Sequence, residues 1–151
     1  MPNDRSTRGQ ETLEKIHAEW GMPKVLAQLD GIAPDLKNLV RDFAFGEVYS
    51  RPNLDLKSRQ LATVAVLAAL QHSPLELKAH LHGALKLGWK KEELVEVLMQ
   101  IVLYAGFPAA IHALLAAKEV FAEHDARTKT AKTKKSRRPP THGEEIKVEK
   151  K

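Results

Sequence analysis

The 151-residue chain contains no cysteine, and aromatic residues make up only 5% of its composition. Without thiols, this sequence carries no disulfide, no thiolate metal site, no cysteine nucleophile and no dithiol redox pair. It also lacks a glycine-rich phosphate loop and an HExxH zinc motif, and the spacing of its residues assigns no Ser–His–Asp set. Thiol chemistry is therefore excluded, and nothing indicates a nucleotide or zinc site.

Long hydrophobic runs are also missing. The most apolar stretch, Leu61–Leu70, is about half as long as a membrane span requires, and the N-terminus lacks the apolar segment of a secretory signal. We therefore expect a cytoplasmic protein without membrane contact. Hydrophobic residues nevertheless amount to 43%, which is enough for a packed core.

Positive charge is concentrated at the C-terminus. Residues 125–151 contain ten Lys and Arg against four Asp and Glu, a net of +6, which leaves the rest of the chain at −1. Residues 127–138 hold seven basic side chains with no acid and no large apolar group, a composition that favours disorder. The functional interpretation is a weak contact between residues 127–138 and nucleic acid or another polyanion. The alternative is a solvated extension that aids solubility.

The rest of the sequence predicts an all-α fold. Its pattern divides the chain into a flexible N-terminus (1–10), an all-α domain (11–124) and a disordered basic tail (125–151). The segments with helical periodicity or helix-boundary residues are 11–20, 23–29, 34–49, 56–71, 73–88, 90–105 and 108–124.

The clearest helix boundaries lie in the second half of the chain. Ser73 followed by Glu76 has the spacing of a capping box, with Pro74 at the first helical position. Gly88 supplies a helix end, and Gly106 followed by a proline interrupts the chain before the last helix.

The predicted helix 56–71 is apolar on every side along Leu61–Leu70, so it must be covered on every side. A single domain of this size with few aromatic residues can hardly bury it. One face is therefore expected to pack against another subunit, whereas a central helix of a monomeric bundle is the alternative. The small residues that would allow close helix approach are Ala62, Ala65, Ala68 and Ala69.

Histidines are the first candidates for chemistry. His80 lies next to Ala79 and near Gly83, which indicates tight packing or close backbone approach around it. His82, two positions further on, points to a different helix face, so the two histidines form a poor metal chelate. His112, one turn into the last helix, is placed to face the same crevice. Ordinary packing or a surface position remains the alternative for each.

Four further residues complete the candidates. Glu47 closes an apolar helix, Arg51 precedes a proline, and Arg59 opens the apolar helix 56–71, where a charge needs a partner or a water-filled cleft. Tyr104 ends a long apolar segment beside the glycine–proline break. Surface ion pairing and core packing would explain these residues without a function.

Five segments occur in a combination that is specific to one family. They are Phe45–Pro52 (FGEVYSRP), Lys57–Arg59 (KSR), His80–Gly88 (HLHGALKLG), Glu92–Leu98 (EELVEVL) and Tyr104–Ala110 (YAGFPAA). Together, and above all through the Tyr-x-Gly-x-Pro-Ala-Ala element, they resemble the carboxymuconolactone decarboxylase family over about residues 35–123. The resemblance implies an all-α helical-bundle subunit of the alkylhydroperoxidase D type. It also implies a ring-like homohexamer with active sites close to the subunit contacts.

The family has two chemical branches. The branch similar to alkylhydroperoxidase D uses a Cys-x-x-Cys pair upstream of the histidine, and those positions hold Ser73 and Glu76 here, so the thiol relay cannot operate. The other branch decarboxylates a carboxylated muconolactone during the breakdown of aromatic compounds, without a cofactor. Decarboxylases of the family usually have an arginine two residues after the histidine and Asn-Asn before the glycine, whereas this chain has His82 and Lys86-Leu87.

The decarboxylase branch implies roles for the candidate residues. Arg51 or Arg59 would orient carboxylates, His80 would be the acid and base, and Glu47 would tune it. No metal is implied. The substrate-binding side would be shaped by Tyr104, Gly106, Pro108, His82 and His112.

The leading interpretation is thus cofactor-free decarboxylation of a small lactone carboxylic acid by a homohexamer. One alternative is a family member of the alkylhydroperoxidase D type that lacks the cysteine pair and has another activity or none. A second alternative is a non-enzymatic hexamer that binds polyanions through its basic tail.

Overall fold

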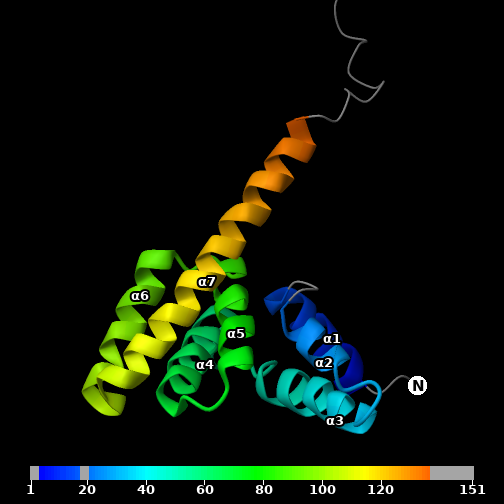
Figure 1. Cartoon of the computed structure of the whole chain (residues 1–151). Coiled ribbons are helices and arrows are strands. Elements are labelled where there is room, and N and C mark those ends of the chain that lie inside the picture. Colours follow the sequence, from blue (N-terminus) through cyan, green and yellow to red (C-terminus); the bar gives the residue numbers. More distant parts are fainter. Residues whose placement is uncertain (1–3, 18–20, 137–151) are drawn as a thin grey trace, which may run out of the picture.

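The computed structural model describes residues 4–17 and 21–136, and every regular element in these ranges is helical (Figure 1). The all-α prediction is therefore confirmed for the described part of the chain. The elements are α1 (Asp4–Ile16), α2 (Met22–Ala27), α3 (Pro34–Leu39), the π-helix η1 (Val40–Val48), α4 (Leu56–Leu70), α5 (Pro74–Lys86), α6 (Lys91–Gln100) and α7 (Val102–Ser136).

The helices form two groups that meet at α5. Helices α4, α5, α6 and the first part of α7 pack into a bundle, and α1, α2, α3 and η1 form a second group that contacts α5 through α1 and α2 (Figure 1). The bundle core contains Val64, Leu81, Leu94, Leu98 and Val120, all with no exposed surface. The second group has its own core of Leu13, Ile16, Met22, Leu26 and Phe45, and Ala79 of α5 joins it. The face of α5 that carries Ala79 is therefore the junction between the two cores.

Helix α3 continues directly into η1, where backbone hydrogen bonds join residues five apart instead of four. The Tyr49 N–H, for example, donates to the Ala44 carbonyl at 2.8 Å. Helix α1 crosses η1 at two glycines. A Cβ atom added at Gly9 would overlap the carbonyl oxygen of Arg41, and one added at Gly46 would overlap the carbonyl oxygen of Arg5. The two backbones can approach this closely only because neither residue has a side chain.

The predicted boundaries of α5 and the break near Pro108 are present. Gly88 has φ 87° and Gly106 has φ 80°, a region that glycine reaches without strain. Gly106 is the non-helical residue within α7, just before Pro108. The capping box at Ser73 does not form, since the Ser73 side chain makes no capping hydrogen bond.

Two helices extend beyond the predicted domain limits. Helix α1 begins at Asp4, inside the segment 1–10 that we expected to be flexible, because Arg5 and Arg8 form ion pairs with Glu47 of η1. Helix α7 continues to Ser136, twelve residues into the segment 125–151 that we expected to be disordered.

The extension of α7 has local support. The hydroxyls of Thr128, Thr130 and Thr133 donate to carbonyls four residues earlier, at 2.9, 2.9 and 3.0 Å, and Lys91 of α6 forms an ion pair with Asp125. Trp20 and residues 137–151 lie outside the described residues.

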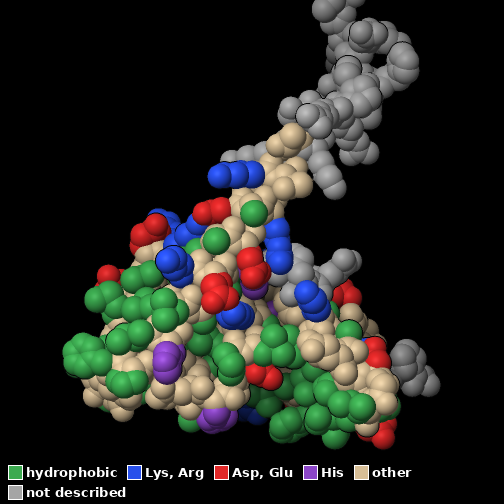
Figure 2. Space-filling view, viewed as in Figure 1, with side chains coloured by type: hydrophobic (Ala, Val, Ile, Leu, Met, Phe, Trp, Pro, Cys, Tyr) green, Lys and Arg blue, Asp and Glu red, His purple; other side chains and the backbone are tan. Residues whose placement is uncertain are grey.

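Large apolar side chains remain exposed on three surfaces, of which the start of α7 is one, where Leu103, Phe107 and Ile111 are more than half exposed (Figure 2). On α4 an i, i+4 row of Ala62, Val66 and Leu70 faces outward, with Val66 56% exposed. A groove of about 490 Å³ runs beside this row, between α4 and α6. The apolar stripe of the predicted helix 34–49 also faces outward, since α3 has no buried residue. Its exposed members are Leu36, Leu39, Phe43 and Val48.

By length and composition alone, the stretch Val102–Ala131 of α7 could cross a membrane, since an 18-residue window within it has a mean hydropathy of 1.2. This is weak evidence, because the first part of the stretch packs into the bundle core. The residues it contributes there include Ala109, Ala113, Ala117 and Val120.

Candidate active site

The imidazole of His80 is fixed by a buried glutamine from the neighbouring helix. Gln60 of α4 has no exposed surface, and its Nε2 lies 3.0 Å from His80 Nδ1 and 2.7 Å from the His80 carbonyl oxygen. An amide nitrogen carries two hydrogens, so Gln60 donates to both atoms. Gln60 Oε1 lies 3.3 Å from the same Nδ1, so the shorter contact with Nε2 favours Nδ1 as the acceptor and the ring proton on Nε2.

A second imidazole lies against His80. His17, at the end of α1, is 3% exposed, and its ring centroid is 5.1 Å from that of His80 at an interplanar angle of 78°. On its other side, His17 meets Phe45 of η1 edge to face, with centroids 5.7 Å apart. Neither ring nitrogen of His17 makes a hydrogen bond with a described residue. A buried polar group without a partner costs about 1–3 kcal/mol.

Helix α5 provides the room and the attachment for this arrangement. A Cβ atom added at Gly83 would lie 2.7 Å from Gln60 Nε2 and 3.1 Å from His17 Nδ1, so glycine leaves space for both side chains. Lys86, one turn further on, donates to the carbonyl of Glu14 and, at 2.9 Å, to that of His17. Both carbonyls belong to the last turn of α1 and the residue after it, and Lys86 therefore holds the end of α1 against α5.

Burial keeps both imidazoles neutral at pH 7. It lowers the pKa of His80 to about 4 and is the main reason that the pKa of His17 is lowered to about 3. The neighbouring His80 and Lys86 lower the pKa of His17 further. The Ala79 carbonyl opposes this shift, although it lies outside hydrogen-bond geometry. His80 can thus act as a neutral donor through Nε2, and 7% of its surface remains exposed.

The other predicted catalytic residues lie elsewhere and do not contact His80 in the described structure. Glu47 pairs with Arg5 at 2.6 Å, on the α1–η1 face. Arg59 donates from Nε to the Leu54 carbonyl at 3.0 Å and from its terminal nitrogen to the Arg51 carbonyl at 3.1 Å. Arg59 therefore braces the connection that carries Arg51.

Arg51 lines an open cleft of about 340 Å³ between α1 and the connection before α4. Its guanidinium has no ion pair among the described residues, and neither does the ammonium of Lys15, which lines the same cleft. Tyr49 forms part of the wall, and its ring lies 5.1 Å from that of Phe45, which in turn contacts His17. The cleft and the buried histidines are thus neighbours separated by aromatic rings.

The predicted substrate-binding residues are dispersed. His82 of α5 lies 2.9 Å, Nε2 to Oε2, from Glu123 of α7 and ties the two helices together. Tyr104 is 84% exposed and lies near the start of α7, beside Gly106 and Pro108. His112 is exposed and lines a narrow hollow at the start of α5. The structure therefore does not bring these five residues to His80.

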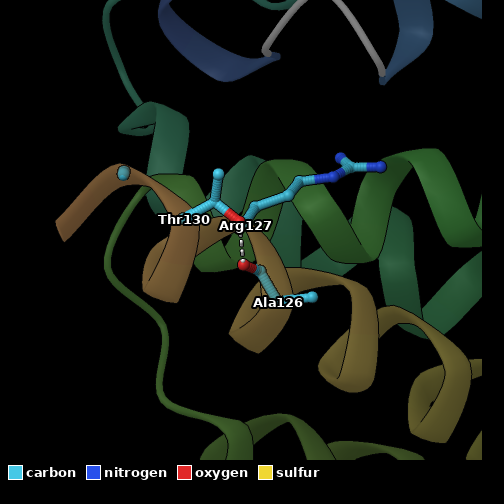
Figure 3. Close-up of a pocket in the computed structure, with 4 residues that line it drawn as sticks. Ala126, Arg127 and Thr130 are labelled. Carbon is cyan, nitrogen blue, oxygen red and sulfur yellow. Dashed lines mark hydrogen bonds between the residues drawn. The ribbon is translucent and has the colours of Figure 1, made fainter. Parts of the chain in front are cut away.

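A hollow on α7 and a metal-binding cluster would be the alternatives to this site. The hollow drawn in Figure 3 measures about 370 Å³, and Ala126, Arg127, Thr130 and Ala131, all from α7, line it. Thr130 donates to the Ala126 carbonyl, Arg127 extends away from both, and no carboxylate or imidazole is present for acid–base chemistry. Within residues 4–17 and 21–136, no group of three or more His, Asp or Glu side chains could hold a metal ion.

The cluster formed by His80, Gln60 and His17 is called the histidine cluster below. Sequence reasoning identified His80 and missed the other two. Gln60 directly precedes the apolar run Leu61–Leu70. A polar amide at the edge of such a run could have indicated a buried hydrogen-bonding partner. His17 lay in a predicted helix with apolar neighbours, but its contact with His80 depends on how α1 packs on α5, which the local pattern does not encode.

These features define a class: an all-α protein in which a helical bundle carries a buried histidine held by a glutamine from the adjacent helix. Within that class, the chain belongs to the carboxymuconolactone decarboxylase family, whose family model matches residues 34–119. The resemblance noted from the sequence is thereby confirmed.

The chain is also similar to three individual proteins. The chain is 38% identical over 117 residues to a 4-carboxymuconolactone decarboxylase of Acinetobacter baylyi, covering 78% of this chain and 87% of that protein. It is 34% identical over 79 residues to the nitrosuccinic acid decarboxylase of Metarhizium robertsii, covering 52% and 54% of the two chains. A 15.0 kDa protein of Paracoccus denitrificans is 30% identical over 98 residues, which cover 64% of this chain and 73% of that one.

Proposed function

We propose that this protein is a carboxy-lyase that decarboxylates a small carboxylic acid, with a carboxylated lactone as the leading substrate, and that it needs no cofactor. The observation that carries the proposal is His80, a buried and neutral imidazole whose proton is assigned to Nε2 by the Gln60 amide. Two relatives named as decarboxylases of different carboxylic acids support the same class of reaction.

Decarboxylation of this kind needs one hydrogen-bond donor beside the substrate carbonyl oxygen. When the bond between the substrate carbon and its carboxylate breaks, CO₂ leaves and the electron pair is delocalised into the neighbouring carbonyl as an enolate. A hydrogen bond from His80 Nε2 to that oxygen would stabilise the developing charge, and a neutral imidazole is suited to this role because it keeps its proton. One proton, ultimately from solvent, then adds to the carbon and restores the carbonyl.

The remaining catalytic candidates take roles that fit their contacts. Arg51, without an ion pair among the described residues, would bind a substrate carboxylate at the cleft, which Tyr49 and Phe45 separate from the histidines within this single chain. Arg59 would keep the Arg51 connection in place through its two backbone contacts. Glu47, already paired with Arg5, would position η1 rather than tune the imidazole directly.

The experiment is a decarboxylation assay with purified protein. We expect 4-carboxymuconolactone to lose its ultraviolet absorbance with release of one equivalent of CO₂, and nitrosuccinate and unsubstituted lactone acids should be tested beside it. CO₂ release from another member of the panel would retain the reaction class and reassign the substrate. No CO₂ release from any of them would contradict the proposal.

We further propose that the active protein is a homo-oligomer, with a hexamer as the expected size. The outward row on α4 supports this, because Ala62, Val66 and Leu70 form an apolar face beside an apolar groove. Ala62 in the row, with Ala65 and Ala69 in the groove beside it, would permit the close helix approach that a self-association surface needs.

Val66→Asp should dissociate this oligomer, because it would place a carboxylate in the centre of the apolar row. Light scattering coupled to size-exclusion chromatography should show a large fall in molecular mass. Lys129→Gln, which changes the net charge by the same amount at an exposed position of α7, is the matched control and should keep the wild-type mass. A wild-type monomer, or an unchanged mass for Val66→Asp, would rule out this interface.

A second candidate function rests on the extension of α7. Beyond Asp125 the helix projects away from the bundle (Figure 1) and carries most of the basic residues of the segment 127–138. We propose that this projecting helix contacts the phosphates of a nucleic acid, because a helix with few apolar residues offers charge rather than a surface for burial.

Replacing Lys129, Lys132, Lys134 and Lys135 together with glutamine should weaken binding to duplex DNA. The slope of log Kobs against log salt should also become shallower by about 3.6 if each of the four lysines contacts one phosphate, since each phosphate contact contributes about −0.9. Fluorescence anisotropy between 50 and 200 mM salt measures both effects, and Lys24→Gln with Lys118→Gln serves as the control on the helical body. Equal slopes for the variant and the wild-type protein would exclude the contact.

A further inference from the structure

The histidine cluster contains one side chain that the proposed function does not use. His17 directly follows α1, outside the residues 34–119 that match the family, yet it is buried and its ring lies against His80. Its nitrogens make no hydrogen bond with a described residue, so no polar contact in the described structure accounts for its place.

The aromatic contacts of the His17 ring account for its position beside His80. Gln60 fixes one edge of the His80 imidazole through Nδ1, but a single hydrogen bond still allows the ring to tilt about that contact. The His17 ring, at 78° to His80, closes a second side. Behind it, Phe45 packs edge to face on His17 at an interplanar angle of 86°.

The His17 ring is itself held firmly. Lys86 donates to the His17 carbonyl at 2.9 Å and so connects the end of α1 to the helix that carries His80. Gly83, between His80 and Lys86 on α5, leaves the space in which the ring sits. The position of the His17 ring is thus set by the same helix whose histidine it touches.

We propose that His17 is a positioning residue for His80, and that its ring is the wall which, with the Gln60 amide, holds the His80 imidazole in one orientation and shields it from water. This role rests on the proposed function of His80 as the donor. It assigns part of the active site to α1, a helix outside the family-matched residues.

Two substitutions separate the ring from its nitrogens. His17→Phe keeps an aromatic wall and removes the unpartnered nitrogens, so it should raise Tm and leave kcat within about threefold of wild type. His17→Ala removes the wall, and kcat should fall on the order of tenfold to a hundredfold with KM little changed, because the donor is no longer aligned. Leu13→Ala, which removes buried surface from the same helix, should lower Tm and leave kcat unchanged.

The decisive readout is the state of His80 itself, which needs no substrate. Nitrogen-15 NMR of the histidine rings should show the Nε2–H tautomer with a pKa near 4 in the wild-type protein and in His17→Phe. In His17→Ala, we expect a mixture of tautomers and a pKa that rises toward 6.5.

Two outcomes would overturn the proposal. One is an unchanged His80 tautomer and pKa in His17→Ala, and the other is an equal change in His17→Phe, which keeps the wall. If the wild-type protein turns over no substrate, the proposed function fails, but the NMR comparison still decides the role of His17.

Discussion

Replacing His80 with alanine is expected to lower the rate of decarboxylation by about 10²–10⁴-fold, with a small effect on KM. The proposed role of Nε2 is to stabilise the enolate oxygen, which exists only after the carboxylate carbon has begun to leave. A donor of this kind acts on the transition state, so its loss appears in kcat. Stopped-flow or steady-state measurement of CO₂ release gives both constants.

The pH dependence provides an independent check of the same residue. Because burial lowers the pKa of His80 to about 4, the imidazole is neutral throughout the ordinary assay range. The contribution of His80 to the rate should therefore be constant from about pH 5 to 8. It should fall only as the pH approaches 4, where Nδ1 takes up a proton and no longer accepts the Gln60 hydrogen bond that aligns the ring. A rate that rises as the pH falls through 6.5 would indicate a protonated histidine and contradict this role.

The matched control is His72→Ala. His72 is exposed, and its ring nitrogen contacts only the Leu70 carbonyl among the described residues, so its loss should leave both kinetic constants unchanged. If His80→Ala retains the wild-type kcat while His72→Ala does the same, His80 has no part in the chemical step.

Substituting alanine at Gly9 or Gly46 is expected to destabilise the fold by roughly 3 kcal/mol or more. In an ordinary helix this change stabilises by about 1 kcal/mol. Here the added Cβ would overlap a backbone carbonyl oxygen of the other segment, Arg41 for Gly9 and Arg5 for Gly46. A flexible side chain could rotate away, but a backbone carbonyl cannot, so α1 and η1 would have to separate.

Thermal or urea unfolding measures this effect, and Gly31→Ala is the control within the same group of helices. A Cβ atom at Gly31 would meet nothing within 4 Å, so its stability should stay within about 0.5 kcal/mol of wild type. Wild-type stability for both Gly9→Ala and Gly46→Ala would show that the crossing is looser than described.

The helices could be predicted largely because their boundaries are local. Pro74 at the first position of α5 and the positive φ of Gly88 and Gly106 depend on backbone chemistry that a short sequence window contains. The helix after Asp125 could not be predicted in the same way. Its hydrogen bonds from threonine hydroxyls to carbonyls and its ion pair with α6 do not follow from the number of basic residues.

The candidate site was harder to predict, because it depends on which helices meet. His80 was found from its neighbours and from the family motif. Its partners Gln60 and His17 come from α4 and α1, and only tertiary packing places them beside it. Helical periodicity also failed along α3, because an apolar stripe such as Leu36 and Leu39 has the same spacing whether it faces a core or the outside.

The two hydrogen bonds that Lys86 gives to the carbonyls of Glu14 and His17 make the end of α1 part of the surroundings of His80. Grafting a foreign first helix onto this chain would therefore retune the buried imidazole while leaving the family motif untouched. Diversification of activity within such a scaffold can proceed at its amino end, at a distance in sequence from the reacting groups.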